Sequence, residues 1–198
     1  MHADRVRVAE PGDRAAVAHM VAAAFADDPA WAFLLSSEYD RLAPLLAAAL
    51  FDTRVATRHV WVTSDLDAVA MWEYMGTDTI SSPDHEQVWR AYRAVAGAPA
   101  WERLVEYDRA VDEVRPRAPH WYLGVLATRP ERQGRGLATA VMGPVLAQAD
   151  REGVDCCLET STHANTLFYE RRGFTESTDV HIASGPPTWW LRRAPRGA

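Results

Sequence analysis

The sequence contains no lysine and only two cysteines among its 198 residues. Without lysine there is no Gly-Lys-Ser/Thr sequence, which excludes a Walker phosphate loop, and no Gly-x-Gly-x-x-Gly motif follows a first strand, which disfavours a dinucleotide-binding fold. No apolar run reaches the ~18 residues that a membrane span needs. The first residues also lack the apolar stretch of a signal peptide. We therefore expect no membrane partner.

The cysteines indicate the cellular compartment, and the net charge indicates the class of binding partner. Cys156 and Cys157 are adjacent, and neighbouring strand positions point to opposite faces, so a disulfide between them is sterically poor. We expect both to be buried and reduced, in a cytoplasmic protein. The formal net charge of −6, without any Arg-rich tract, argues against a nucleic-acid partner and favours a cationic amine.

The length and the 48% hydrophobic content suit one domain over residues 1–198. Hydrophobic spacing predicts a first strand, a helix after the turn at Pro11, a second helix, a β-hairpin, and two helices separated at Gly97. A final hairpin turns around Gly185. The predicted strands span residues 5–9, 60–63, 68–74, 122–128, 155–160, 176–183 and 188–193. The second helix spans 40–57, and a short helix spans 165–171.

Residues 121–174 contain the patterns on which the functional prediction depends. Residues 122–128 predict a strand buried on both faces, followed by the turn Gln133-Gly134-Arg135-Gly136 and then Leu137, Val141, Val145 and Ala149 at helical spacing. Unpaired amides and the dipole at that helix start suit a pyrophosphate, although the glycines taken alone are weak evidence and are more typical of a plain tight turn. We expect Pro144 to bend or interrupt this helix, and Gly153 to end it.

Two motifs that are separated in the sequence resemble those of a known family. Gln133-x-x-Gly136-x-Ala138 after an apolar strand, followed by Asn165 and Phe168-Tyr169-Glu170-x-x-Gly173-Phe174, resembles the acyl-coenzyme A core of the GCN5-related N-acetyltransferases (GNAT). The members of that family that acetylate puromycin are resembled in particular by Ala24-Phe25-Ala26-Asp27, Leu158-Glu159-Thr160-Ser161 and Gly185-Pro186-Pro187-Thr188-Trp189. The resemblance implies an α/β (α+β) fold, with a central mixed and mostly antiparallel twisted sheet, flanking helices and a helical insertion at 76–119.

The resemblance also implies acetyl-CoA as co-substrate, without a metal, bound by the core at 121–174. The main chain at Leu126 and Thr128 would pair with the pantetheine arm, with an amide near Leu126 facing the thioester carbonyl. Arg132 and Arg135 could screen phosphate charge or simply be solvated. The cofactor-binding residues carried over are Leu126, Ala127, Thr128, Gln133, Gly134, Arg135, Gly136, Leu137, Ala138, Thr139 and Asn165.

Tyr169 is the candidate proton donor to the departing thiolate, because a phenol with an ordinary pKa near 10 can donate to it. The alternative for Tyr169 is a buried ring packed beside Phe168. A general base is less defined: Glu159 could accept the ammonium proton through water, and His120 and Glu73 are rivals, each of the three having a structural alternative.

The resemblance implies acetylation of a primary amine of a small molecule, such as a puromycin-like aminonucleoside or another antibiotic, which would confer antibiotic resistance. The alternatives are another metabolite or peptide amine, and a non-catalytic acyl-CoA sensor. We expect the insertion at 76–119 to cover the acceptor cleft, with Phe25, Trp31 and Tyr39 as candidate acceptor contacts or plain core. Trp189-Trp190 could be a patch for a possible homodimer.

Overall fold

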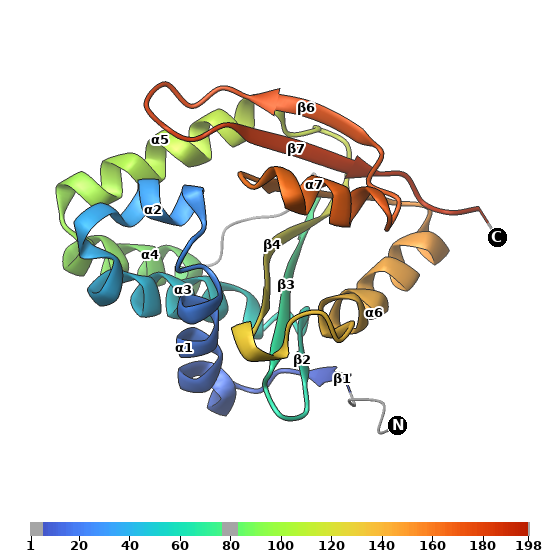
Figure 1. Cartoon of the computed structure of the whole chain (residues 1–198), viewed down its shortest axis with the longest axis horizontal. Coiled ribbons are helices and arrows are strands. Elements are labelled where there is room, and N and C mark those ends of the chain that lie inside the picture. Colours follow the sequence, from blue (N-terminus) through green and yellow to red (C-terminus); the bar gives the residue numbers. More distant parts are fainter. Residues whose placement is uncertain (1–5, 77–82, 198) are drawn as a thin grey trace.

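A computed structural model describes residues 6–76 and 83–197 and shows one seven-stranded sheet in the order β1-β2-β3-β4-β5-β7-β6 (Figure 1). The pair β4–β5 is parallel and the other neighbours are antiparallel. The predicted mixed, mostly antiparallel sheet is confirmed. The strands are β1 Val6–Val8, β2 Val60–Thr63, β3 Ala68–Met75, β4 His120–Thr128, β5 Asp155–Thr160, β6 Glu176–Val180 and β7 Thr188–Arg193.

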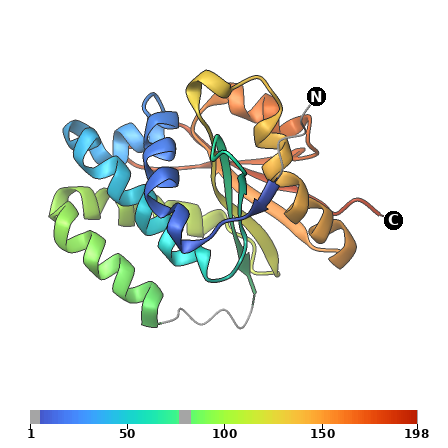
Figure 2. The ribbon, with the colours of Figure 1, turned by 90° about the horizontal axis from the view of Figure 1, so that it is seen from below.

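Helices cover both faces of the sheet. Helices α1 to α5 lie on one side, and α6 and α7 lie on the other (Figures 1 and 2). Each side has its own buried cluster of apolar side chains. The helices are α1 Arg14–Ala24, α2 Pro29–Leu35, α3 Tyr39–Val55, α4 Pro83–Ala96, α5 Ala98–Val114, α6 Leu137–Glu152 and α7 His163–Glu170, with short 3-10 turns at Pro11–Asp13, Ser36–Glu38 and Pro130–Arg132.

Adjacent residues on the inner strands point into different cores. Cys156 packs in the cluster under α6 and Cys157 in the cluster under α1 and α3, and both thiols are free and buried. Burial raises the pKa of each cysteine to about 12, so neither is a thiolate near neutral pH. Trp190 is core while Trp189 is partly buried on the opposite face, so these two rings do not form one patch.

Strands β4 and β5 separate part of the way along. They pair only from His120↔Asp155 to Tyr122↔Cys157, although β4 continues to Thr128. The prediction that 122–128 is buried on both faces is only partly confirmed. Leu123 packs in the cluster under α6, and Val125 and Ala127 pack in the cluster under α1 and α3, so both faces carry buried side chains. The alternate residues Tyr122, Gly124, Leu126 and Thr128 are only half-buried. These residues line cavities that the separation opens.

Most predicted elements are confirmed within a few residues, with two corrections. Helix α2 was not predicted. Helix α6 is continuous through Pro144, so the predicted interruption is wrong; its buried face, with Val141, Val145 and Ala149, packs on the sheet and keeps the chain helical despite the missing N–H. Parts of two predictions, Arg5 of the first strand and 77–82 of the insertion, lie outside the described residues.

Candidate active site

Two cavities meet beside the free edge of β4. The cavity that we call the β5 cavity has a volume of about 330 Å³ and lies among β4, β5, α2, α3 and α5. The other, which we call the α6 cavity, has a volume of about 580 Å³ and lies between the end of β4, the start of α6 and α7. The residues that line both are Phe25, Asp28, Leu126, Asn165 and Tyr169.

The start of α6 forms one wall of the α6 cavity. Gly134 and Gly136 have φ of 75° and 83°, the left-handed region that glycine adopts without strain. No side chain among the described residues caps this helix, and its first amides have no acceptor within the helix. Because nothing lies within 4 Å of a Cβ built at either glycine, the backbone here is open to a diphosphate, which fits the pyrophosphate of coenzyme A.

The structure brings together nearly all the predicted cofactor residues. Every one of them lines the α6 cavity except Arg135, which is exposed and lines neither of the two cavities. Arg132 lines the cavity, but its Nε lies 2.9 Å from Asp67 Oδ2, and Arg129 pairs with the same carboxylate at 2.8 Å. Asp67 is therefore shared by two arginines, and one positive charge of this group is not balanced by it.

Arg172 is a cation of the α6 cavity that the sequence reasoning missed. Its Nε donates to Thr139 Oγ1 at 3.0 Å, and another guanidinium nitrogen donates to the carbonyl of Phe168 at 2.6 Å. The guanidinium carbon lies 3.4 Å from the centroid of the Phe168 ring. The spacing of Phe168 and Arg172, four residues apart at the end of a predicted helix, was the available signal.

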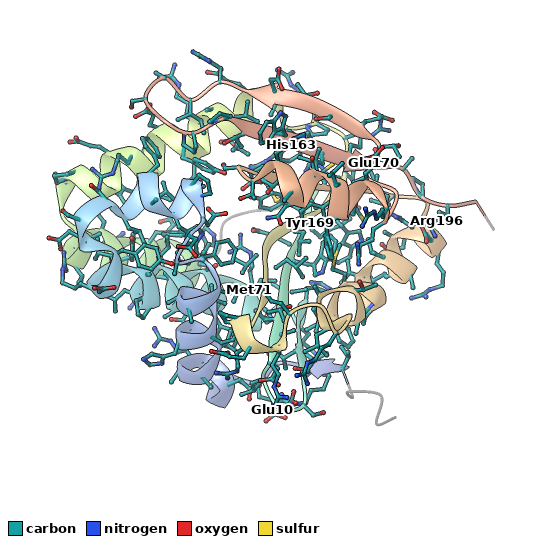
Figure 3. All side chains as sticks on the ribbon, in the orientation of Figure 1. Glu10, Met71, His163, Tyr169, Glu170 and Arg196 are labelled. Carbon is teal, nitrogen blue, oxygen red and sulfur yellow. The ribbon has the colours of Figure 1, made fainter. Side chains whose placement is uncertain are left out.

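Tyr169 stands where the two cavities meet. It lies on α7 near the middle of the molecule (Figure 3), is 8% exposed, and packs against Phe168 and Phe174 with ring centroids 5.2 Å and 5.7 Å away. Burial, and then the nearby charge of Glu159, raises the pKa of Tyr169 above its ordinary value. The phenol therefore keeps its proton at neutral pH and is available as a donor.

Glu159 lies on β5 in the wall of the β5 cavity. Its Oε1 accepts a hydrogen bond from the Tyr122 hydroxyl at 2.9 Å, while Oε2 is buried without a hydrogen-bond partner among the described residues. Burial raises the pKa of Glu159 to about 7, against the lowering effect of the Tyr122 hydrogen bond. A carboxylate with a pKa near neutrality suits a general base.

The two rival bases are placed less favourably. His120 is buried, lines neither the β5 cavity nor the α6 cavity, and holds its Nδ1 2.9 Å from the Ala118 carbonyl oxygen. Burial lowers the pKa of its imidazole. Glu73 does line the β5 cavity, but it is ion-paired with Arg54 at 3.1 Å. Glu159 is thus the carboxylate among the predicted bases that has no arginine partner within ion-pair distance.

The junction is shaped by a bulge in β4. The register with β3 shifts at Gly124, which has no partner on β3. A Cβ at Gly124 would lie 3.0 Å from a guanidinium nitrogen of Arg54, so glycine allows this buried arginine to pack against the strand. The bulge lies two residues before Leu126 and leaves the following main chain facing the cavities.

The β5 cavity is lined by aromatic rings and by more carboxylates than arginines. Of the predicted acceptor contacts, Phe25 and Trp31 line it, whereas Tyr39 does not and donates its hydroxyl to the Ala22 carbonyl at 2.8 Å. Helices α4 and α5 supply part of the wall, including Trp89 and Tyr107. The charged residues are Asp28, Glu73, Asp108, Asp112 and Glu159 against Arg54 and Arg115.

Two glycine substitutions test whether the first amides of α6 bind acetyl-CoA. Gly136→Ala places a Cβ on a left-handed residue, which we expect to cost roughly 1–2 kcal/mol and to weaken acetyl-CoA binding roughly tenfold, the loss of about one charge-assisted hydrogen bond. Isothermal titration calorimetry measures the affinity. The control is Gly143→Ala, inside α6 with open space around its Cβ, which should stabilise the fold by roughly 0.5–1 kcal/mol and leave affinity unchanged. Equal affinities in both variants would contradict the assignment.

The described residues hold neither a metal-binding cluster nor a membrane-spanning helix. Within 6–76 and 83–197, no group of three or more His, Cys, Asp or Glu side chains is placed to hold a metal ion. Over the same ranges, no helix has the length and apolar character needed to cross a membrane.

Comparisons with known proteins agree with this geometry. Residues 84–176 match the family model of the acetyltransferase (GNAT) domain. An uncharacterized N-acetyltransferase of Schizosaccharomyces pombe is 24% identical over 171 residues, which cover 80% of this chain and 69% of that protein.

Solved structures of similar fold span almost the whole chain. One from Corynebacterium glutamicum, described as histone acetyltransferase HPA2 and related acetyltransferase, has a TM-score of 0.63 at 20% identity and covers 98% of this chain and 97% of its own. The Drosophila melanogaster polyamine N-acetyltransferase, which forms N-acetylagmatine, has a TM-score of 0.65 at 15% identity. The match covers 96% of this chain and 99% of that protein's chain. Arylalkylamine N-acetyltransferase 2 of Aedes aegypti has a TM-score of 0.65 at 10% identity, with 97% and 99% covered. Residues 84–176 therefore match a GNAT acetyltransferase domain, and the chain has the fold of these acetyltransferase structures, which together indicate an acyltransferase enzyme.

Proposed function

We propose that the protein acetylates the primary amine of a small cationic molecule, with acetyl-CoA in the α6 cavity and the acceptor in the β5 cavity. The observation that carries this proposal is that the two cavities meet at Tyr169 and Leu126. A thioester entering from one side and an amine entering from the other would meet at that junction. No covalent enzyme intermediate is needed, and the buried cysteines would be poor nucleophiles.

Direct transfer assigns one task to each group at the junction. The amine nitrogen bonds to the acetyl carbon as the carbon–sulfur bond breaks, and a main-chain amide near Leu126 stabilises the oxyanion. Glu159 takes the ammonium proton, directly or through water. Tyr169 gives its proton to the departing thiolate and regains one from solvent. The aromatic packing of Tyr169 holds the donor in place.

The lining of the β5 cavity supports a small cationic acceptor. Five carboxylates face two arginines, and each arginine is already ion-paired with one of the carboxylates. The remaining negative charge and the aromatic rings favour an ammonium group. At about 330 Å³ the cavity is near the small end of the roughly 300–1,000 Å³ of ligand pockets, which favours a small molecule over a peptide.

The acceptor itself has two candidate classes. A puromycin-like aminonucleoside or another aminated antibiotic is proposed from the resemblance of the sequence motifs, and the aromatic lining suits its planar groups. The similar structures named for polyamine and arylalkylamine acetyltransferases add a second class, metabolite amines. The carboxylate excess favours the second class when the acceptor carries more than one positive charge.

A stepwise assay tests the proposal. Acetyl-CoA should raise the melting temperature of the protein, and thiol release should then follow with at least one member of a panel of aminonucleosides, polyamines, arylalkylamines and peptides. Turnover with peptides alone would overturn the small-molecule assignment. Acetyl-CoA binding without thiol release from any amine would favour a sensor, and no binding at all would contradict the proposal entirely.

A further inference from the structure

Tyr122 occupies the point at which β4 and β5 part. It is the last residue of β4 that pairs with β5, opposite Cys157, and its side chain lines the β5 cavity. Glu159 lies two residues further along β5 and so points to the same face. The hydroxyl of Tyr122 donates to Glu159 Oε1 at 2.9 Å. The end of the strand pairing therefore places a phenol against the carboxylate of the proposed base.

The ring of Tyr122 is fixed from more than one element. Trp190 of β7 stacks on it, with ring centroids 5.9 Å apart and an interplanar angle of 8°. The guanidinium carbon of Arg115 lies 5.2 Å from the centroid of the same ring, and Arg115 is in turn held by Asp112 at 2.6 Å. A ring constrained in this way presents its hydroxyl in one position.

The carboxylate of Glu159 has little else to orient it. Its second oxygen, Oε2, is buried and accepts no hydrogen bond within the described part of the chain. The hydrogen bond from Tyr122 therefore determines which oxygen is occupied and which is left to accept a proton. Among the predicted bases, Glu73 differs in this respect because an arginine holds it.

We propose that Tyr122 is a positioning residue that orients Glu159 and sets the proton affinity of its carboxylate. The inference rests on the proposed function, in which Glu159 is the general base. A hydrogen bond donated to a carboxylate stabilises its ionised form, so the bond from Tyr122 lowers the pKa of Glu159 against the larger raising effect of burial. Loss of the donor should raise that pKa, and the acidic limb of the activity profile should move to higher pH.

Other charged and titratable groups face this pair and remain in the variants described below. They come from the second half of α5 and the residue after it, from α7 and from α3. The groups are Tyr107, Asp108 and Arg115, whose charges act on Glu159 or respond to it, together with Tyr169 and, facing Tyr122, Arg54.

The test compares kcat/KM from about pH 5 to pH 9 in wild type, Tyr122→Phe and Glu159→Gln, with the best amine of the acceptor panel. We expect the acidic limb to move up by roughly one pH unit in Tyr122→Phe, with the ring still stacked on Trp190. Tyr92→Phe is the control, because Tyr92 is a buried tyrosine of α4 that lines neither the β5 nor the α6 cavity. The acidic limb of the Tyr92→Phe profile should stay at the wild-type pH.

A second variant keeps the test decisive if Tyr122→Phe does not fold. Replacement of Tyr122 by a difluorotyrosine preserves the ring and makes the phenol a stronger donor, so the limb should move to lower pH. If the acidic limb of the kcat/KM profile is lost in Glu159→Gln but keeps its wild-type pH in both Tyr122 variants, the positioning role of Tyr122 is overturned while the proposed function stands. A limb that persists in Glu159→Gln would instead show that the proposed function has the wrong base.

Discussion

Tyr169→Phe is expected to lower kcat by roughly 10²–10³-fold while acetyl-CoA affinity stays nearly unchanged. The substitution removes only the hydroxyl, and the ring contacts with Phe168 and Phe174 can remain. Without a donor the departing thiolate must take its proton from water, in a cavity where burial disfavours its charge. Steady-state kinetics of thiol release, with titration calorimetry for the cofactor, measures both quantities.

The control for Tyr169→Phe is Tyr39→Phe. That hydroxyl donates to the Ala22 carbonyl at 2.8 Å and lies outside the lining of both the β5 and the α6 cavity. Its removal should cost about 1 kcal/mol of stability and leave turnover intact. Wild-type turnover in Tyr169→Phe would remove the phenol from the mechanism, and an equal loss in both variants would indicate a structural effect.

Glu159→Gln is expected to lower kcat/KM by roughly 10²–10⁴-fold, since it keeps the shape of the side chain and removes the base. In wild type, burial places the pKa of Glu159 at about 7. The active form is the ionised one, so kcat/KM should rise as the pH increases through about 7 and then level off. Glutamine cannot ionise, and this limb should disappear from the variant's pH profile.

Glu176→Gln provides the matched control for Glu159→Gln. Glu176 lies on β6, is exposed, and pairs with Arg192 at 2.6 Å. Surface ion pairs of this kind contribute roughly 0–1 kcal/mol, and the pH profile should keep its limb. If Glu159→Gln retained both its activity and the limb near pH 7, the base would have to be another group.

The sequence predicted the strands well because their signals are local. Alternation and β-branched residues mark β5, and the observed bounds Asp155–Thr160 match the prediction. Helix α2 was not predicted because Asp27-Asp28-Pro29 is also a pattern that ends a helix. Asp28 also caps α2, accepting from the Trp31 amide at 3.0 Å, and Pro29 occupies a first helical position where proline is favoured.

The turn that we propose to bind the cofactor could be predicted because its motif is contiguous. The glycines and the first residues of α6 lie within a few positions, and Gly134 and Gly136 have the left-handed φ that such a turn requires. The ion pair of Arg132 with Asp67 could not be predicted, because the two residues lie far apart in the sequence. Ion pairs across the fold are not visible in local patterns.

Phe25, Trp31 and Glu159 were expected on the acceptor side and line the β5 cavity, but the contacts among its residues could not be predicted, for the same reason. The contact of Tyr122 with Glu159 joins residues 37 positions apart, and it depends on where β4 and β5 stop pairing. The stack of Trp190 on Tyr122 also depends on the position of β7 beside β5. These are consequences of packing rather than of periodicity, and they decide which carboxylate is free to act as a base.

A crystal structure with coenzyme A tests the central claim most directly. The account predicts the diphosphate within hydrogen-bond distance of the first amides of α6, and the thiol at the junction of the two cavities beside the Tyr169 hydroxyl. A diphosphate bound away from Gly136, or a sulfur remote from Tyr169, would contradict it.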